Sequence, residues 1–194
     1  MSRTPRLAAF IAAGAAAVLA LTACASGSTD ASDGDAAGIG PVTEGKLTIA
    51  TGEFAYEPWV VGDAPESGEG FEAAVAYAVA EELGYAAEDV VWVRTSFDAA
   101  IAPGPKDFDL NLQQFSITEE RAQVVDFSSP YYVTTQAVVA ASGTPAAEAT
   151  SIADLQDVVL GVQSGTTSLQ AVEELIAPNT DVQVFNTNDD AVAA

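Results

Sequence analysis

The sequence predicts an α/β fold with a mainly parallel sheet, followed by the beginning of a second lobe. From residue 46 onward, short apolar or alternating runs that suit strands alternate with runs of helical spacing, the order typical of parallel sheets with helices between their strands. The 149 residues after position 45 suffice for one ordinary domain and are too few for two complete α/β lobes. A soft stretch at 142–150 divides them, so the second lobe is expected to be incomplete.

The N-terminus has the layout of a secretory signal peptide. Arg3 and Arg6 precede an apolar run at 7–21 that is shorter than the roughly 20 residues of a membrane-spanning helix. The small residues before Cys24 resemble the lipobox of bacterial lipoproteins, which implies cleavage after residue 23 and a lipid on the Cys24 sulfur. The alternative is an ordinary signal peptide in which Cys24 has no special role.

Residues 24–45 are expected to form a flexible tether. They are rich in Ala, Ser, Gly and Asp and nearly lack large apolar side chains, so they cannot build a core. A linker of this length spans about 25 Å root-mean-square, which would lift a small domain away from a membrane.

The first lobe is expected over residues 46–137. Alternating or continuous apolar runs predict its strands, and apolar residues every four positions predict its first helix. Ser96 and Thr118 are placed to cap two later helices. In order, the expected elements are a strand at 46–51, a helix at 71–83 ended by Gly84, a buried strand at 90–93, a helix at 98–101, a strand at 109–112 and a helix from 119.

A hinge strand and a partial second lobe are expected over residues 138–194. The same signals of apolar runs, caps and breakers apply here. In order, they predict a strand at 136–141, a turn of helix capped by Ser151, a strand at 158–162, a helix at 168–177 stopped by Pro178, a strand at 182–185 and a helix start at 186–189.

Composition excludes several classes of function. The chain has no histidine and one cysteine, so Ser-His and Cys-His nucleophilic sites and His/Cys zinc sites are excluded. From Cys24 on it holds four basic and 28 acidic residues, a formal charge of −24, which argues against nucleic acid or an anionic bilayer surface as a partner. A carboxylate site for calcium or magnesium and acid–base pairs of carboxyl groups stay open.

Arg121 is the candidate carboxylate receptor. It follows Ser116 and Thr118 in a chain with few basic residues. A guanidinium can bind both oxygens of a carboxylate, and nearby hydroxyls can donate to the remaining lone pairs. The alternative is a solvated arginine in the first turn of a helix, since most surface arginines make no specific contact.

Aromatic side chains follow the first two predicted strands. Tyr56 and Trp59 lie in a loop stiffened by Pro58, and Phe97 begins the helix after the second strand. Parallel sheets bind ligands at the carboxyl ends of their strands, so these rings could contact a ligand. The equal alternative is that they only pack against the core or a surface turn.

Two polar runs complete the candidate site. Gln114 and Ser116 lie in the run Asn-Leu-Gln-Gln-Phe-Ser that leaves the third strand, and Thr166 and Thr167 follow Gly165 at the start of a helix. Hydroxyls and free N–H groups at such a start could bind an anion. A simple helix cap is the alternative for the second run.

Together these motifs resemble the extracellular solute-binding proteins of amino-acid ABC transporters, family 3, the polar amino-acid cluster. The matching runs include Ser-Ile-Thr-Glu-Glu-Arg at 116–121 and Val-Gln-Ser-Gly-Thr-Thr at 162–167, and they are specific jointly rather than one by one. The remaining matches lie at residues 47–51, 56–59, 70–72, 80–84, 97–101, 108–109, 125–132 and 154–155.

The resemblance implies the type 2 periplasmic-binding-protein fold, in which two α/β lobes close on a hinge around a free amino acid. It implies that Arg121 and Ser116 hold the ligand carboxylate and that Thr166 and Thr167 donate from the second lobe. Tyr56 and Phe97 would sandwich the ligand side chain. The acidic partner of the ligand ammonium group would follow residue 194, so the chain is interpreted as a fragment or shortened form.

The expected function is therefore a lipid-anchored receptor on the extracytoplasmic face of a bacterial membrane, monomeric, delivering an amino acid to ABC permease subunits. No catalytic residue, cofactor or metal is expected. Gln113 and Gln114 stand where the family often has small residues, which could narrow the pocket. Two alternatives stay open: an enzyme on the same fold resembling cyclohexadienyl dehydratase, and a truncated sensor or other non-transport domain.

Overall fold

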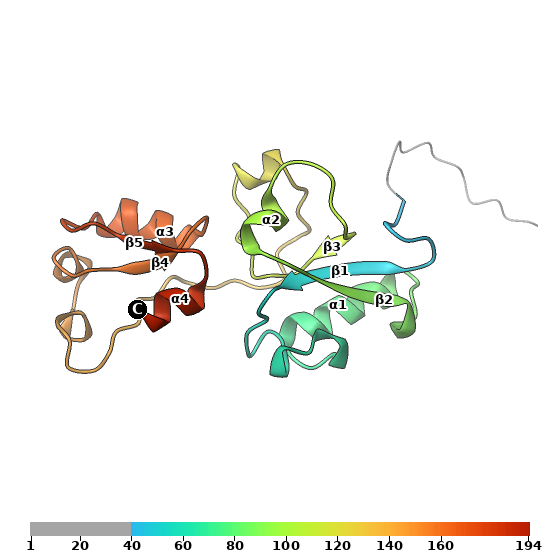
Figure 1. Ribbon diagram of the computed structural model, residues 1–194, viewed down its shortest axis with the longest axis horizontal. Helices are drawn as coiled ribbons and strands as arrows, with labels where there is room; N and C mark the ends of the chain where they lie inside the picture. The colour runs from blue at the N-terminus through green and yellow to red at the C-terminus, as the bar shows by residue number, and fades with distance from the viewer. Residues whose placement is uncertain (1–39) are drawn as a thin grey trace, which may run out of the picture. The chain divides into compact units, whose positions relative to one another are not determined.

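A computed structural model describes residues 40–194. Strand β1 (Leu47–Gly52) lies at the centre of the first sheet (Figure 1). The sheet has the order β2-β1-β3, with β2 (Val90–Thr95) and β3 (Leu110–Asn111) both parallel to β1. All six residues of β1 are buried because a strand flanks it on each side. The predicted parallel α/β arrangement is confirmed. The expected signal peptide, Cys24 and most of the tether lie outside the described residues.

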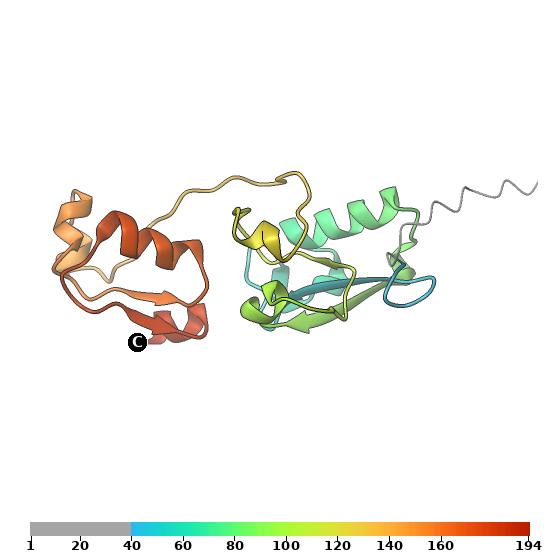
Figure 2. The ribbon, with the colours of Figure 1, turned by 90° about the horizontal axis from the view of Figure 1, so that it is seen from above.

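Helix α1 (Phe71–Glu82) packs on one face of this sheet (Figure 2). Its buried residues are Glu72, Ala73, Ala76 and Ala80. The large apolar side chains that recur every four positions, Phe71, Val75, Val79 and Leu83, lie further out, with Leu83 57% exposed. Small alanines let the helix approach the sheet closely, so the core forms from them and from Leu47, Ile49 and Leu112.

The remaining predicted elements of the first lobe form, with differences in extent. Ser96 caps α2 (Phe97–Ile101) by accepting a hydrogen bond from Ala99 N at 3.2 Å. β2 is an edge strand with half-buried and exposed side chains, so the expectation of a buried strand there was wrong. After Thr118 the chain forms one 3-10 turn, η4 (Arg121–Gln123), in which Thr118 Oγ1 accepts from Arg121 N at 3.2 Å.

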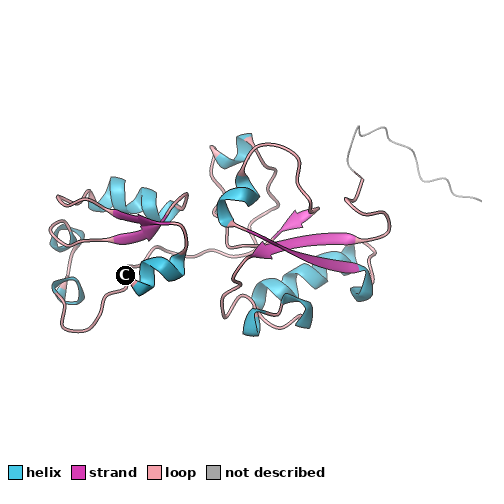
Figure 3. Cartoon of the chain, viewed as in Figure 1, coloured by secondary structure: helices cyan, strands magenta, loops and turns pink. Residues whose placement is uncertain are grey.

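The second part of the chain holds a two-stranded parallel sheet of β4 (Gly161–Gln163) and β5 (Gln183–Phe185), drawn in Figure 3. α3 (Thr167–Ala171) continues into a wider turn, η7 (Val172–Ile176). α4 (Asn188–Ala193) follows β5. A small core of Leu155, Leu160 and Ile176 joins these elements. The helix and the two strands predicted here are confirmed, although β4 begins later than expected.

Short 3-10 turns connect these elements. They are η1 (Val61–Asp63), η2 (Pro65–Ser67), η3 (Ala87–Asp89), η5 (Pro145–Glu148) and η6 (Ile152–Leu155). Among residues 40–194, no helix has the length and apolar character needed to cross a membrane.

The strand expected at 136–141 does not form. This segment has no regular secondary structure, and no neighbouring strand in the described part of the chain pairs with it. Val139 is 95% exposed. Because a strand is defined by its ladder of hydrogen bonds to a neighbour, apolar character alone was not enough to make one.

Candidate functional site

Arg121 is buried, with 7% of its surface exposed. One terminal nitrogen, Nη1, donates to the Ser116 carbonyl oxygen at 2.8 Å, and Nη2 donates to the Gly165 carbonyl oxygen at 2.8 Å. A guanidinium has five N–H donors, so these two bonds leave donor capacity on both terminal nitrogens. Burial lowers the pKa of Arg121, while the nearby Glu120 charge opposes that shift. The alternative of a solvated surface arginine was wrong.

Two stacked phenylalanine rings lie against this guanidinium. The Phe97 and Phe115 ring centroids are 4.2 Å apart with an interplanar angle of 27°. Arg121 Cζ lies 5.5 Å from the Phe97 centroid and 5.4 Å from the Phe115 centroid, within range of cation–π attraction. The rings fix the plane of the guanidinium and shield it from water. Phe115 was not among the predicted site residues.

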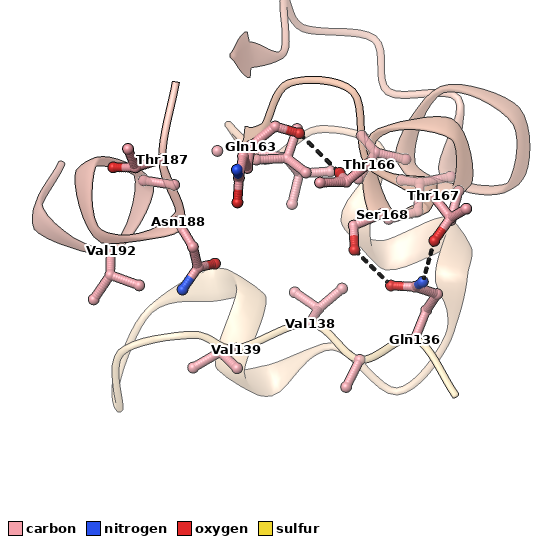
Figure 4. A pocket seen from close by; sticks show the side chains of 18 of the residues that line it. Gln136, Val138, Val139, Gln163, Thr166, Thr167, Ser168, Thr187, Asn188 and Val192 are labelled. Carbon is pink, nitrogen blue, oxygen red and sulfur yellow. Dashed lines mark hydrogen bonds between the residues drawn. The ribbon is translucent and has the colours of Figure 1, made fainter. Parts of the chain in front are cut away.

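A chain of hydroxyl and amide groups lies beside Arg121. Ser116 Oγ is 3.0 Å from Thr167 Oγ1, and Gln136 Nε2 donates to the same Thr167 oxygen at 3.2 Å. Ser168 Oγ donates to Gln136 Oε1 at 2.8 Å (Figure 4). Sequence reasoning found Ser116 and Thr167 but missed Gln136 and Ser168. The available signal for Gln136 was its position, since it is a polar residue directly before the apolar run at 137–141.

Thr166 has a structural contact of its own. Its hydroxyl oxygen accepts from Leu169 N at 3.1 Å, which caps α3, and its hydroxyl donates to the Gln163 carbonyl at 2.8 Å (Figure 4). The helix-cap alternative is therefore correct for Thr166. Gly165 has φ of +68°, a left-handed value that glycine adopts readily.

Gln114 is turned toward α1. Its backbone N–H donates to Glu72 Oε1 at 2.9 Å, and its side-chain Nε2 donates to Glu72 Oε2. Tyr131 also donates to Glu72 Oε1, at 2.6 Å. Glu72, which sequence reasoning missed, is thus the common acceptor of a buried network at the edge of the site.

Tyr56 is half-buried in the loop after β1. Burial raises its pKa, and the nearby Asp189 and Asp190 charges at the start of α4 raise it further. Its hydroxyl therefore stays protonated near neutral pH and can donate.

The structure brings all seven predicted site residues to one cleft: Tyr56, Phe97, Gln114, Ser116, Arg121, Thr166 and Thr167. The cleft has a volume of about 1780 Å³, which exceeds the roughly 300–1,000 Å³ of common small-molecule sites. In the described residues, no cluster of three or more Asp, Glu, Cys or His side chains could hold a metal ion.

Residues 47–193 match the family described as bacterial extracellular solute-binding proteins, family 3. The chain belongs to this family. Among curated proteins it is 29% identical over 131 residues to a probable amino-acid ABC transporter periplasmic-binding protein, y4tE, of Sinorhizobium fredii, covering 64% of this chain and 42% of that protein. It is 35% identical over 80 residues to a probable histidine-binding protein of Campylobacter jejuni, covering 40% and 30%.

Solved structures of amino-acid-binding proteins share the fold. An ancestral arginine-binding protein bound to glutamine is 32% identical with a TM-score of 0.64, covering 78% of this chain and 64% of that one. A periplasmic binding protein of Salmonella typhimurium with high arginine specificity is 28% identical with a TM-score of 0.60, covering 76% and 63%. The expected type 2 periplasmic-binding fold is confirmed, and the chain spans less than two thirds of each of these relatives.

Proposed function

We propose that this protein binds a free amino acid, or a close analogue, for an ABC importer, and that Arg121 holds the ligand carboxylate. The observation that carries the proposal is a buried guanidinium with unused N–H donors, placed beside two hydroxyls in a cleft. Its relatives support this class of ligand: an ancestral arginine-binding protein holds glutamine or arginine, and another relative is a probable histidine-binding protein. All of these relatives are binding proteins, which favours a receptor over an enzyme.

The geometry suits a carboxylate. Its two oxygens offer about four acceptor sites. Arg121 would donate to them from both terminal nitrogens, and the Ser116 and Thr167 hydroxyls would donate to the remaining lone pairs. These hydroxyls are bonded to each other at 3.0 Å, so a ligand would replace a weak neutral bond with charge-assisted ones, which are about twice as strong.

The rest of the ligand would lie between Tyr56 and Phe97. Phe97 is backed by Phe115 at 4.2 Å, which makes it a rigid platform for a side chain. Because the cleft is wider than an amino acid requires, its walls would have to approach each other around the ligand. The segment at 136–141, which pairs with no strand in the described residues, would serve as the hinge for that motion.

Binding can be measured by calorimetry and thermal unfolding with a panel of amino acids and their carboxamides. We expect at least one amino acid to raise the unfolding midpoint by mass action, while its carboxamide, which lacks the charged carboxylate, binds far more weakly. Arg121→Lys should weaken binding about 10- to 100-fold, because a charge-assisted fork worth roughly 1.5–3 kcal/mol is lost.

Arg94→Lys is the matched control. Arg94 forms a surface ion pair with Asp63 at 2.6 Å, so the same substitution there should leave affinity unchanged. Equal affinity of Arg121→Lys and the wild type, or a panel in which no amino acid binds, would refute the proposal.

We also propose lipid anchoring through Cys24 at the extracytoplasmic face of the membrane, next to the permease. The family is extracellular by its description, and the charge of −24 argues against electrostatic attachment of the chain to an anionic bilayer. Cys24→Ser should release the protein from the membrane fraction of expressing cells. Retention of the variant in that fraction would contradict the anchor.

A further inference from the structure

We infer that Glu72 is a positioning residue of the proposed amino-acid site: its buried carboxylate fixes the loop that carries Gln114, Phe115 and Ser116. This inference rests on the proposed function. Within residues 40–194, Glu72 and Arg121 are the two charged side chains that are buried, and Glu72 is 1% exposed. Burying a carboxylate is costly unless it is fully hydrogen-bonded, so this one calls for an explanation.

Three donors converge on the Glu72 carboxylate. They are Gln114 N at 2.9 Å, the Gln114 side-chain amide, and the Tyr131 hydroxyl at 2.6 Å. Neither of the two ion pairs in the described part of the chain involves Glu72. Neutral donors from two segments, the loop of Gln114 and the segment of Tyr131, therefore stabilise the carboxylate. In turn, the carboxylate connects both segments to α1.

Gln114 depends on these bonds for its conformation. Its φ is +53°, a left-handed value that is strained for a non-glycine residue. Both its backbone and its side chain bond to Glu72, which compensates that strain. Partial burial and the bond to Glu72 raise the pKa of Tyr131, so its hydroxyl stays a donor.

The loop that Glu72 holds leads directly into the site. Phe115, the next residue, stacks on Phe97 and faces the Arg121 guanidinium. Ser116 then accepts from Arg121 Nη1 through its carbonyl and meets Thr167 through its hydroxyl. Fixing residue 114 thus sets the direction in which the next two residues present these groups.

The same helical turn holds the aromatic loop. The N–H groups of Phe71 and Glu72 donate to the Pro58 and Trp59 carbonyls at 3.0 and 2.9 Å. Gly70 permits this approach, because a Cβ there would lie 2.5 Å from the Trp59 oxygen. The first turn of α1 therefore positions two loops. Its backbone N–H groups bind the loop of Tyr56, and the Glu72 side chain binds the loop of Gln114.

The test is Glu72→Gln, with Glu81→Gln on the exposed side of α1 as the matched control. The glutamine keeps the shape of the side chain but removes the negative charge that the three donors share, and it turns the oxygen that accepts from the Gln114 side-chain amide into a donor. We expect the dissociation constant for the amino acid found in the panel to rise about tenfold or more, as one lost bond predicts. Glu81→Gln should bind like the wild type.

A swapped pair separates positioning from simple stability. In Glu72→Gln/Gln114→Glu the amide and the carboxylate exchange places, and an acceptor oxygen remains for Gln114 N and for Tyr131. Affinity should return to within about threefold of the wild type. A Glu72→Gln protein with unchanged affinity would overturn the inference. So would a swapped protein that is folded but binds as weakly as Glu72→Gln.

Amide hydrogen exchange tests the positioning role of Glu72 without any ligand. If the wild-type protein bound no amino acid, the proposed function would fail while the positioning role could still be measured. Amides at 113–117 should then exchange faster in Glu72→Gln than in Glu81→Gln. Equal exchange rates in this loop would overturn the role of Glu72.

Discussion

Gly165→Ala should destabilise the turn that meets Arg121. Gly165 has φ of +68°, and a Cβ built on it would lie 2.6 Å from Asp98 Oδ1. The left-handed backbone costs an alanine about 1–2 kcal/mol. The steric conflict adds less, because the Asp98 side chain is exposed and can turn away. In turning it would give up its 3.5 Å contact with Ser164 Oγ.

The expected total is about 2 kcal/mol, which lowers the unfolding midpoint of a chain of this size by roughly 4–8 °C. Thermal unfolding followed by circular dichroism measures it. Asp98→Ala/Gly165→Ala should recover the smaller, steric part of the loss and leave the backbone part. A Gly165→Ala protein as stable as the wild type would show that this turn does not hold its left-handed conformation.

Two further predictions concern helix caps. Ser96→Ala should cost about 1 kcal/mol in unfolding free energy, because Ser96 caps α2 through Ala99 N at 3.2 Å; denaturant unfolding would show it, and an unchanged midpoint would count against the cap. Asp154 accepts from Thr150 and Ser151, and these hydrogen bonds lower its pKa below the ordinary 3.8. Its contribution to stability is therefore present above pH 3.8 and disappears as pH falls through the lowered pKa. Wild type should exceed Asp154→Asn in midpoint at about pH 6, and the difference should vanish in stronger acid; a difference independent of pH would disprove this.

Much of the fold could be predicted because its signals are local. The alternation at 46–51 became β1, and the Ser96 cap became the start of α2. The face of α1 was harder, because alanines rather than the larger apolar residues that recur every four positions meet the sheet. Which face of a helix packs closely depends on the shape of the sheet surface that it meets, and the helical period alone does not predict that shape.

The segment at 136–141 shows the limit for strands. Its apolar run has the composition of a strand, but strand formation requires a partner ladder, and none in the described residues reaches it. The composition of one segment carries no information about its neighbours.

Site residues that belong to a local sequence motif could be predicted, whereas residues that join the site only through tertiary contacts were missed. Arg121, Ser116 and Thr167 come together as the family resemblance implied. The role of Glu72 depends on donors 42 and 59 positions away, which no local pattern reveals. Gln114 was expected to face a ligand, and its amide instead bonds to Glu72.

The most direct test of the central claim is a crystal structure of this chain with the amino acid that raises its unfolding midpoint most. The account predicts both carboxylate oxygens of that ligand within about 3 Å of the Arg121 terminal nitrogens, with a Ser116 or Thr167 hydroxyl completing the contact. A ligand whose carboxylate lies against other groups, while Arg121 still donates only to the Ser116 and Gly165 carbonyls, would contradict it.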